Sequence, residues 1–306
     1  MVIPAYRVAA YIAGVIARVP PVVGHIVVVD DASPDPLQSV LAAVQDPRLT
    51  IVRHEVNRGV GGAMKTGFRH ALDLGADVVV KIDGDGQMDP ELIPQLVGPI
   101  VSGDADFTKG NRFDDLSFIR RMPFVRRLGN MALSFLVKLA SGYWHAFDPC
   151  NGYVALRASV LRRLNPDRLE DRYFFEISLL CEAYFARAVL QDIPMRPVYA
   201  GETSSLSPAG SIADFTPRLV RRSLHRVLMT YFVRDFNVVS VFLVSGLPAV
   251  LFGVAWSAYH WMQSIRLQKL ASTGTVIIGM LGIVLGFQLL LQAIVLDVGN
   301  EPRRHR

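Results

Sequence analysis

The chain has 306 residues, of which 51% are hydrophobic, and its mean hydropathy is +0.31. This length holds one sizeable α/β domain and a smaller part, and the hydropathy is high for a soluble enzyme. The net charge is +5, but the arginines gather beside apolar C-terminal runs, so we expect anionic lipid headgroups as partners and no nucleic acid. Cys150 and Cys181 have neither metal-ligand spacing nor the density of a disulfide framework, which fits a reducing compartment.

The beginning of the chain alternates between strand and helix patterns. Val2 and Ile3 predict a short strand that Pro4 ends, residues 9–19 predict a helix, and residues 26–29 predict a buried strand. This alternation predicts a mostly parallel sheet with crossover helices. The first residues lack a charged segment followed by an apolar one, so we expect no signal peptide and a cytosolic location for the first two-thirds of the chain.

Two acidic residues, Asp30 and Asp31, follow the second predicted strand. A carboxylate at a strand tip can accept hydrogen bonds from a nucleotide's base or ribose. Alternatively, Asp31 or Ser33 caps the next helix, because both residue types are common N-caps.

A third predicted strand, residues 50–54, leads into the glycine-rich stretch 57–67. The stretch is not a Walker A motif, because Met64 stands where glycine should precede Lys65, and it lacks the third glycine of a dinucleotide fingerprint. Its glycines allow a ligand to approach the backbone closely at a helix N-terminus. The predicted helix ends near Leu74.

A fourth predicted strand, residues 77–82, ends at Asp83 and Asp85. Ligands bind at this edge of an open α/β sheet, and two aspartates separated by one glycine can hold a divalent cation on a diphosphate. An EF-hand is excluded, because its sixth and twelfth positions would be Met88 and Pro94. A simple Asp-Gly turn is the alternative.

Four short motifs stand in order along the chain: Ile3-Pro4-Ala5-Tyr6, Val29-Asp30-Asp31-Ala32-Ser33, Asn57-Arg58-Gly59 and Asp83-Gly84-Asp85-Gly86-Gln87-Met88-Asp89-Pro90. Together they resemble a family 2 glycosyltransferase with the GT-A fold, over about residues 1–205. The resemblance implies Mg²⁺ or Mn²⁺ held by Asp83 and Asp85, with Gln87 near the sugar or the metal. Asp85, Gln87, Arg112 and Asp148 are the expected catalytic residues. The nucleotide contacts that it implies are Pro4, Ala5, Tyr6, Asp31, Asn57, Gly59, Asp83 and Gly84.

Later segments also fit this family. Arg112 stands in the place of the family's Gly-Ser-Arg segment and can neutralise phosphate, although an ordinary surface arginine is the alternative. Asp148 and the following residues up to Tyr153 resemble the element that lines the acceptor side. The stretch 201–206 looks like a closing segment that carries Ser205, but its usual basic residue is missing, which leaves Arg196 as the nearest cation.

The arginine cluster 120–127 precedes a predicted helix at residues 128–141. Arginines interleaved with Phe and Met suit a surface that touches lipid headgroups or a lipid phosphate, and we assign Arg126 and Arg127 to the acceptor phosphate together with Arg196 and Ser205. A solvated basic turn is the alternative.

The C-terminal third predicts membrane association. Residues 212–233 form an amphipathic pattern typical of a helix in the membrane interface, or of a helix packed on the catalytic domain. Residues 236–265 and 270–296 contain no Asp, Glu, Lys or Arg, so each predicts a transmembrane helix, with buried core helices as the alternative. Basic residues flank both ends of this pair, which predicts two crossings and a cytosolic C-terminus. Gly282-x-x-x-Gly286 is a weak signal for self-association.

We therefore expect an α/β GT-A catalytic domain at 1–211, a juxtamembrane helix at 212–235, a transmembrane hairpin at 236–300 and a basic tail at 301–306. The predicted activity is metal-dependent, inverting transfer of a sugar from a UDP- or GDP-sugar to a polyprenyl phosphate at the cytosolic face of the inner membrane. One alternative is transfer to a hydroxyl of a glycolipid or polysaccharide, with Asp148, Asp171 or Glu176 as base. A second is an inactive nucleotide-binding scaffold.

Overall fold

The computed structural model describes residues 1–112, 124–195 and 208–304. The chain divides into two compact units, which are described separately. The first comprises Met1–Ser223 with Pro302–Arg306, and the second comprises Leu224–Glu301.

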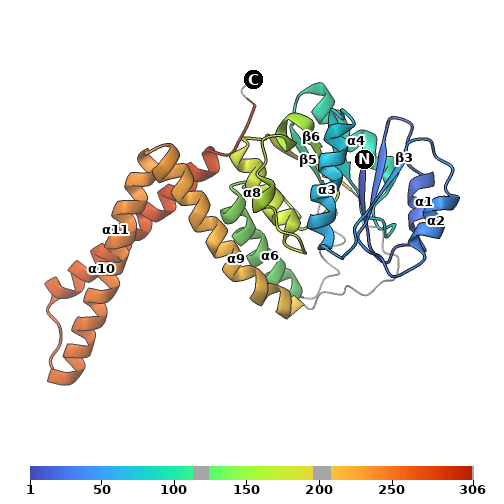
Figure 1. The fold of residues 1–306 in the computed structure, drawn as a ribbon. Coiled ribbons are helices and arrows are strands. Elements are labelled where there is room, and N and C mark those ends of the chain that lie inside the picture. Colours follow the sequence, from blue (N-terminus) through green and yellow to red (C-terminus); the bar gives the residue numbers. More distant parts are fainter. Residues whose placement is uncertain (113–123, 196–207, 305–306) are drawn as a thin grey trace. The chain divides into compact units, whose positions relative to one another are not determined.

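Figure 1 shows the fold of the chain as a ribbon. The first unit is built on one seven-stranded sheet of order β3-β2-β1-β4-β6-β5-β7. Its strands are β1 Val2–Ala5, β2 Ile26–Asp30, β3 Leu49–Arg53, β4 Val78–Lys81, β5 Phe107–Asn111, β6 Val154–Arg157 and β7 Leu190–Pro194. The first four strands are parallel neighbours, and β6 alone runs antiparallel to its neighbours β4 and β5. The expected mostly parallel α/β sheet is confirmed, and its first four strands end at one edge.

Alternate side chains of the buried strands face two separate cores. In β2, Val27 and Val29 belong to one core, while Ile26 and Val28 belong to the other. The first core is covered by α3 Gly59–Asp73, α6 Phe124–Ser141, α7 Ala158–Leu161 and α8 Phe175–Phe185, and the second by α1 Ile12–Ala17, α2 Leu37–Ala43 and α4 Ile93–Ser102. The sheet is therefore a central layer with helices on both faces, as a mostly parallel sheet requires.

The helix α9 Pro208–Leu228 uses two apolar faces in different ways. Phe215 and Leu219 are buried in the first core, whereas Val220, Leu224 and Leu228 are exposed. The buried face agrees with the alternative of a helix packed on the catalytic domain, and a place of the exposed residues in the membrane interface stays a prediction. The π-helical turn Met229–Arg234 follows α9.

The second unit contains two long apolar helices, α10 Val238–Leu267 and α11 Thr273–Gly299. Both are long and apolar enough to cross a membrane, and only 22% and 11% of their most apolar windows are buried. Low burial disagrees with the alternative of two core helices and agrees with the predicted pair of transmembrane helices.

Glycines allow α10 and α11 to pack closely. A Cβ on Gly253 would lie 2.6 Å from the backbone nitrogen of Ile283, and one on Gly286 would lie 2.7 Å from that of Val250. Gly282 likewise faces Gly253. The glycines that we considered for self-association therefore line the contact within the hairpin.

Candidate active site

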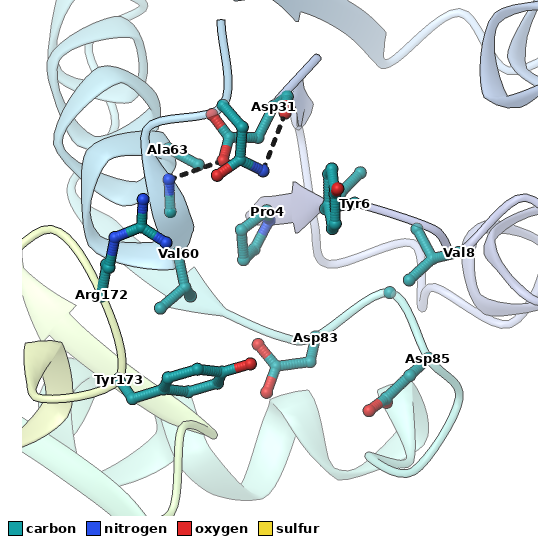
Figure 2. Close-up of a pocket in the computed structure, with 14 residues that line it drawn as sticks. Pro4, Tyr6, Val8, Asp31, Val60, Ala63, Asp83, Asp85, Arg172 and Tyr173 are labelled. Carbon is teal, nitrogen blue, oxygen red and sulfur yellow. Dashed lines mark hydrogen bonds between the residues drawn. The ribbon is translucent and has the colours of Figure 1, made fainter. Parts of the chain in front are cut away.

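The C-terminal ends of β1, β2, β3 and β4 surround a pocket of about 290 Å³ (Figure 2). Its lining residues are Pro4, Ala5, Tyr6, Val8, Asp31, Asn57, Gly59, Val60, Ala63, Asp83, Gly84, Asp85, Arg172 and Tyr173. Every residue that we predicted to contact a nucleotide lines this pocket. The parallel register explains this, because the chain leaves each strand at the same edge.

Asp31 organises one wall of the pocket. Its carboxylate accepts hydrogen bonds from the backbone amides of Arg58 (2.9 Å) and Gly59 (2.7 Å), and it lies 2.7 Å from Nδ1 of His54. The side-chain amide of Asn57 donates to the backbone carbonyl of Asp31 (3.3 Å; Figure 2). Asp31 therefore fixes the start of α3. It does not cap the following helix, α2, which has Pro36 at its N-cap and no side-chain cap.

The glycines at the start of α3 lie in close contact with the backbone of residues 170–171. A Cβ on Gly59 would lie 2.4 Å from the Asp171 carbonyl oxygen, and one on Gly61 would lie 1.9 Å from that of Glu170. The Gly61 amide donates to the Asp171 carbonyl at 2.8 Å. The segment around Asp171 therefore lies against these glycines, while Gly59 also lines the pocket. A ligand approach at this helix N-terminus stays a prediction.

Asp83 and Asp85 lie across the pocket from Asp31 (Figure 2). The Lys81 ammonium, which is fully buried, lies 2.7 Å from Oδ1 of Asp83 and 3.3 Å from Oε1 of Glu176. Burial opposes the charge of Lys81, but the two carboxylates outweigh it and the pKa of Lys81 is raised. Burial raises the pKa of Glu176, and Lys81 offsets this in part. One buried cation therefore links Asp83 to the first turn of α8.

Gly152 lies directly against this charged cluster. A Cβ on Gly152 would lie 2.3 Å from Nζ of Lys81, 3.1 Å from Oδ2 of Asp83 and 3.3 Å from Oε1 of Glu176. Only glycine fits between the cluster and the turn before β6 without a displacement. The segment that resembles the family's acceptor element thus meets the pocket at Asp83.

Arg112 and Asp148 form a bidentate ion pair. Nε of Arg112 lies 2.6 Å from Oδ2 of Asp148, and Nη2 lies 2.8 Å from Oδ1. The Asp148 side chain is buried, whereas that of Arg112 is 39% exposed. The buried Lys109 donates to the Asp148 carbonyl at 3.1 Å and holds this turn against β5. The Asp148 carboxylate is therefore engaged in an ion pair with the Arg112 guanidinium.

Comparison with protein families identifies residues 1–164, which are more than half of the chain, as glycosyl transferase family 2. The chain belongs to this family. It is 29% identical over 189 residues to a UDP-N-acetylglucosamine–dolichyl-phosphate N-acetylglucosaminyltransferase of Methanococcus voltae, a match that covers 57% of this chain and 75% of that protein. It is 32% identical over 157 residues to an undecaprenyl-phosphate mannosyltransferase of Micrococcus luteus, covering 50% and 63% of the two chains.

A third relative is a polyprenol monophosphomannose synthase of Mycolicibacterium smegmatis, which is 30% identical over 163 residues, covering 52% and 61% of the two chains. Among solved structures, Staphylococcus aureus TarS 1–349 in complex with UDP-GlcNAc aligns with a TM-score of 0.47 and 15% identity, covering 98% of this chain and 88% of that chain.

Of the other residues that we predicted for this family 2 site, Gln87, Arg112, Arg127 and Asp148 are described and do not line the pocket. Gln87 donates its backbone amide to Oδ1 of Asp85 at 2.9 Å. Arg127 is half-buried on α6. Arg196, Ser205 and the Arg126 side chain lie outside the described residues.

By resemblance, we expected the acidic groups of residues 170–176 near the acceptor, but sequence reasoning assigned no role in the nucleotide pocket to Arg172 and Tyr173. Both lie between the 3₁₀ turn Pro166–Arg168 and α8. The Tyr173 hydroxyl points toward the Asp83 carboxylate (Figure 2). Lys81 was also missed. The signal for Lys81 is a lone charge inside an apolar strand, because a buried lysine needs carboxylate partners.

The chemistry of the donor set indicates which kind of metal site fits the pocket. Among the described residues, no group of three or more His, Cys, Asp or Glu side chains is arranged to hold a metal. Asp83 and Asp85 nevertheless fit a cation of the Mg²⁺ type, which is often bound by one or two carboxylates and completed by substrate phosphates and water. They would hold such an ion only together with a bound diphosphate.

Proposed function

We propose that this family 2 glycosyltransferase is a metal-dependent, inverting enzyme of the cytoplasmic membrane that moves a sugar from a nucleotide donor to a polyprenyl phosphate. The observation that carries the proposal is a pocket in which residues that follow β1 and β2 face Asp83 and Asp85. The relatives named for transfer to dolichyl or undecaprenyl phosphate support the class of acceptor.

The donor nucleotide would lie against Pro4, Ala5 and Tyr6, with its diphosphate directed to Asp83 and Asp85. A bound Mg²⁺ or Mn²⁺ would supply positive charge to the diphosphate leaving group. Asp31 would act mainly by holding the backbone of residues 58 and 59 in place, because its carboxylate already accepts hydrogen bonds from their two amides.

The acceptor side supports a phosphate nucleophile. A hydroxyl acceptor needs a general base, and each of the three acids that we considered is in an ion pair: Asp148 with Arg112, Asp171 with Lys65 (2.5 Å) and Glu176 with Lys81. A phosphate monoester is already an anion at neutral pH and can attack the anomeric carbon directly. Arg112 is exposed enough to lower the repulsion between acceptor and donor phosphates.

The membrane location is proposed from the hairpin and the chain ends. Both ends of the second unit join the first unit, because Pro302–Arg306 belongs to the first unit and Arg304 pairs with Asp106 at 3.0 Å. Two crossings therefore agree with the proposal that the catalytic unit and the basic tail share the cytosolic side.

A transfer assay with membranes that contain the full chain tests this proposal. We expect label from a UDP- or GDP-sugar to enter a lipid that mild acid hydrolyses, only when polyprenyl phosphate is supplied. Label that enters only a hydroxyl-bearing glycolipid would replace this proposal with the hydroxyl-acceptor alternative. If no donor is consumed with either acceptor, the inactive scaffold becomes the better account.

A further inference from the structure

The segment that closes the nucleotide pocket on its α8 side, residues 168–176, is called the pocket wall below. It contributes Arg172 and Tyr173 to the lining, and both come from a part of the chain far from the four strand tips. Tyr173 is 57% exposed, so its ring is not fixed by burial of its own. Its position depends on how the rest of the wall is held.

On one side the wall is held by α3. Lys65 donates to the Leu169 carbonyl at 3.0 Å and pairs with the Asp171 carboxylate. The Gly61 amide binds the Asp171 carbonyl. These contacts attach the wall to an element that also begins at the pocket.

On the other side the wall is held by α9. Arg222 lies 3.2 Å from Oε1 of the buried Glu182 and 3.6 Å from Oε1 of Glu170, and it also donates to the Arg168 carbonyl. Arg222 is only 14% exposed. One arginine of α9 thus binds the start of the wall and the helix that follows the wall.

Two further residues of α9 reinforce this contact. The Arg218 guanidinium lies 3.5 Å from Oε2 of Glu170 and 5.9 Å from the centre of the Phe174 ring. Phe215 packs edge-on against Phe174 with ring centres 5.3 Å apart. Phe174 directly follows Tyr173, so α9 holds the residue next to the pocket lining.

We propose that α9 positions the pocket wall and thereby sets the affinity for the donor nucleotide, with Arg222 as the principal positioning residue. This inference rests on the proposed nucleotide-binding function. Arg222 and Arg218 would act through Arg172 and Tyr173 and would not touch the nucleotide themselves.

The test measures the dissociation constants of UDP and GDP, each with Mn²⁺, by calorimetry on the full chain in detergent. Arg222→Met should weaken binding roughly tenfold, within the range typical of coupling between separate sites. Arg222→Lys should recover part of the loss, because it keeps a cation near Glu182. The matched control is Arg221→Met, since Arg221 is exposed and has no ion pair with any described residue.

Glu170→Gln provides a second variant if Arg222→Met does not fold, because Glu170 is 37% exposed and its replacement leaves the core intact. It should weaken binding about threefold. If Arg222→Met folds and binds the nucleotides with wild-type affinity, the inference is overturned. If Arg222→Met does not fold, wild-type affinity of Glu170→Gln would overturn it. Equal losses in Arg221→Met and Arg222→Met would also overturn it. Failure of the wild type to bind either nucleotide would instead contradict the proposed function itself.

Discussion

Nζ of Lys81 lies 2.7 Å from Oδ1 of Asp83 in a place where the lysine side chain has no exposed surface. The same ammonium lies 3.3 Å from Glu176, so a single cation neutralises a carboxylate of the pocket and one of α8. Removal of one member of a buried ion pair leaves an uncompensated charge. This arrangement leads to the first prediction.

Lys81→Met should lower the free energy of unfolding by about 3–5 kcal/mol, because Asp83 and Glu176 lose their shared partner. The double variant Lys81→Met/Glu176→Gln should recover part of this loss, since only the partly exposed Asp83 carboxylate is then left without its partner. Thermal and denaturant unfolding of the purified chain measures both effects. Arg162→Met, at an exposed arginine, serves as the control. Equal losses in the single and double variants would contradict a shared ion pair.

Gly152→Ala should reduce sugar transfer and destabilise the fold by about 1–3 kcal/mol, because its Cβ would lie 2.3 Å from Nζ of Lys81. The rate of transfer and the midpoint of thermal unfolding are the measurements. The control is Gly98→Ala in α4, where a Cβ has nothing within 4 Å. A Gly152→Ala enzyme with wild-type transfer would show that the space beside Lys81 is not needed.

Asp148→Asn should retain transfer within about tenfold of the wild type, since an asparagine keeps one acceptor for Arg112 and a phosphate acceptor needs no base. Asn also tolerates the left-handed backbone at this position, where φ is +48°. Initial rates with polyprenyl phosphate test this expectation. A loss of a thousandfold or more in a folded variant would favour Asp148 as a general base.

Cys150 should react slowly with iodoacetamide at neutral pH. Cys150 has exposed surface as a residue, but desolvation of its thiol by the surrounding chain, together with the negative charges of Glu176 and Asp148, raises the pKa of the thiol to about 12. The thiolate is the reactive form, so at pH 8 only about one thiol in ten thousand would be ionised, and the rate should rise about tenfold per pH unit. Mass spectrometry across pH 7–10 follows this, with Cys150→Ser as the control. Complete labelling within minutes at pH 7.5 would contradict the raised pKa.

Much of the pocket could be predicted from the sequence, because the end of each strand is visible as the point where an apolar run meets polar residues. Pro4, Asp31 and Asp83 each follow such a run, and parallel strands bring their ends together. The pocket wall could not be predicted in this way. Tyr173 reaches the pocket only because α3 and α9 hold its segment there, and no local pattern encodes those distant contacts.

Periodicity also could not separate the two possible surroundings of α9. A basic amphipathic helix looks the same whether its arginines face lipid headgroups or buried carboxylates. The structure gives two of these arginines buried carboxylate partners: Arg222 binds Glu182, and Arg226 binds Asp297 within the second unit at 2.7 Å. The glycines of α3 posed a similar ambiguity, because the close approach of a ligand and the close approach of another backbone segment both require glycine.

The most direct test of the account is calorimetric binding of UDP and GDP to the purified full chain, with Mn²⁺ and again with EDTA. We predict that at least one nucleotide binds with Mn²⁺ and that Asp85→Asn and EDTA each weaken it by about a hundredfold, whereas Asp104→Asn at an exposed acid leaves it unchanged. Binding that survives both EDTA and Asp85→Asn would contradict the assignment of Asp83 and Asp85 to a metal–diphosphate site.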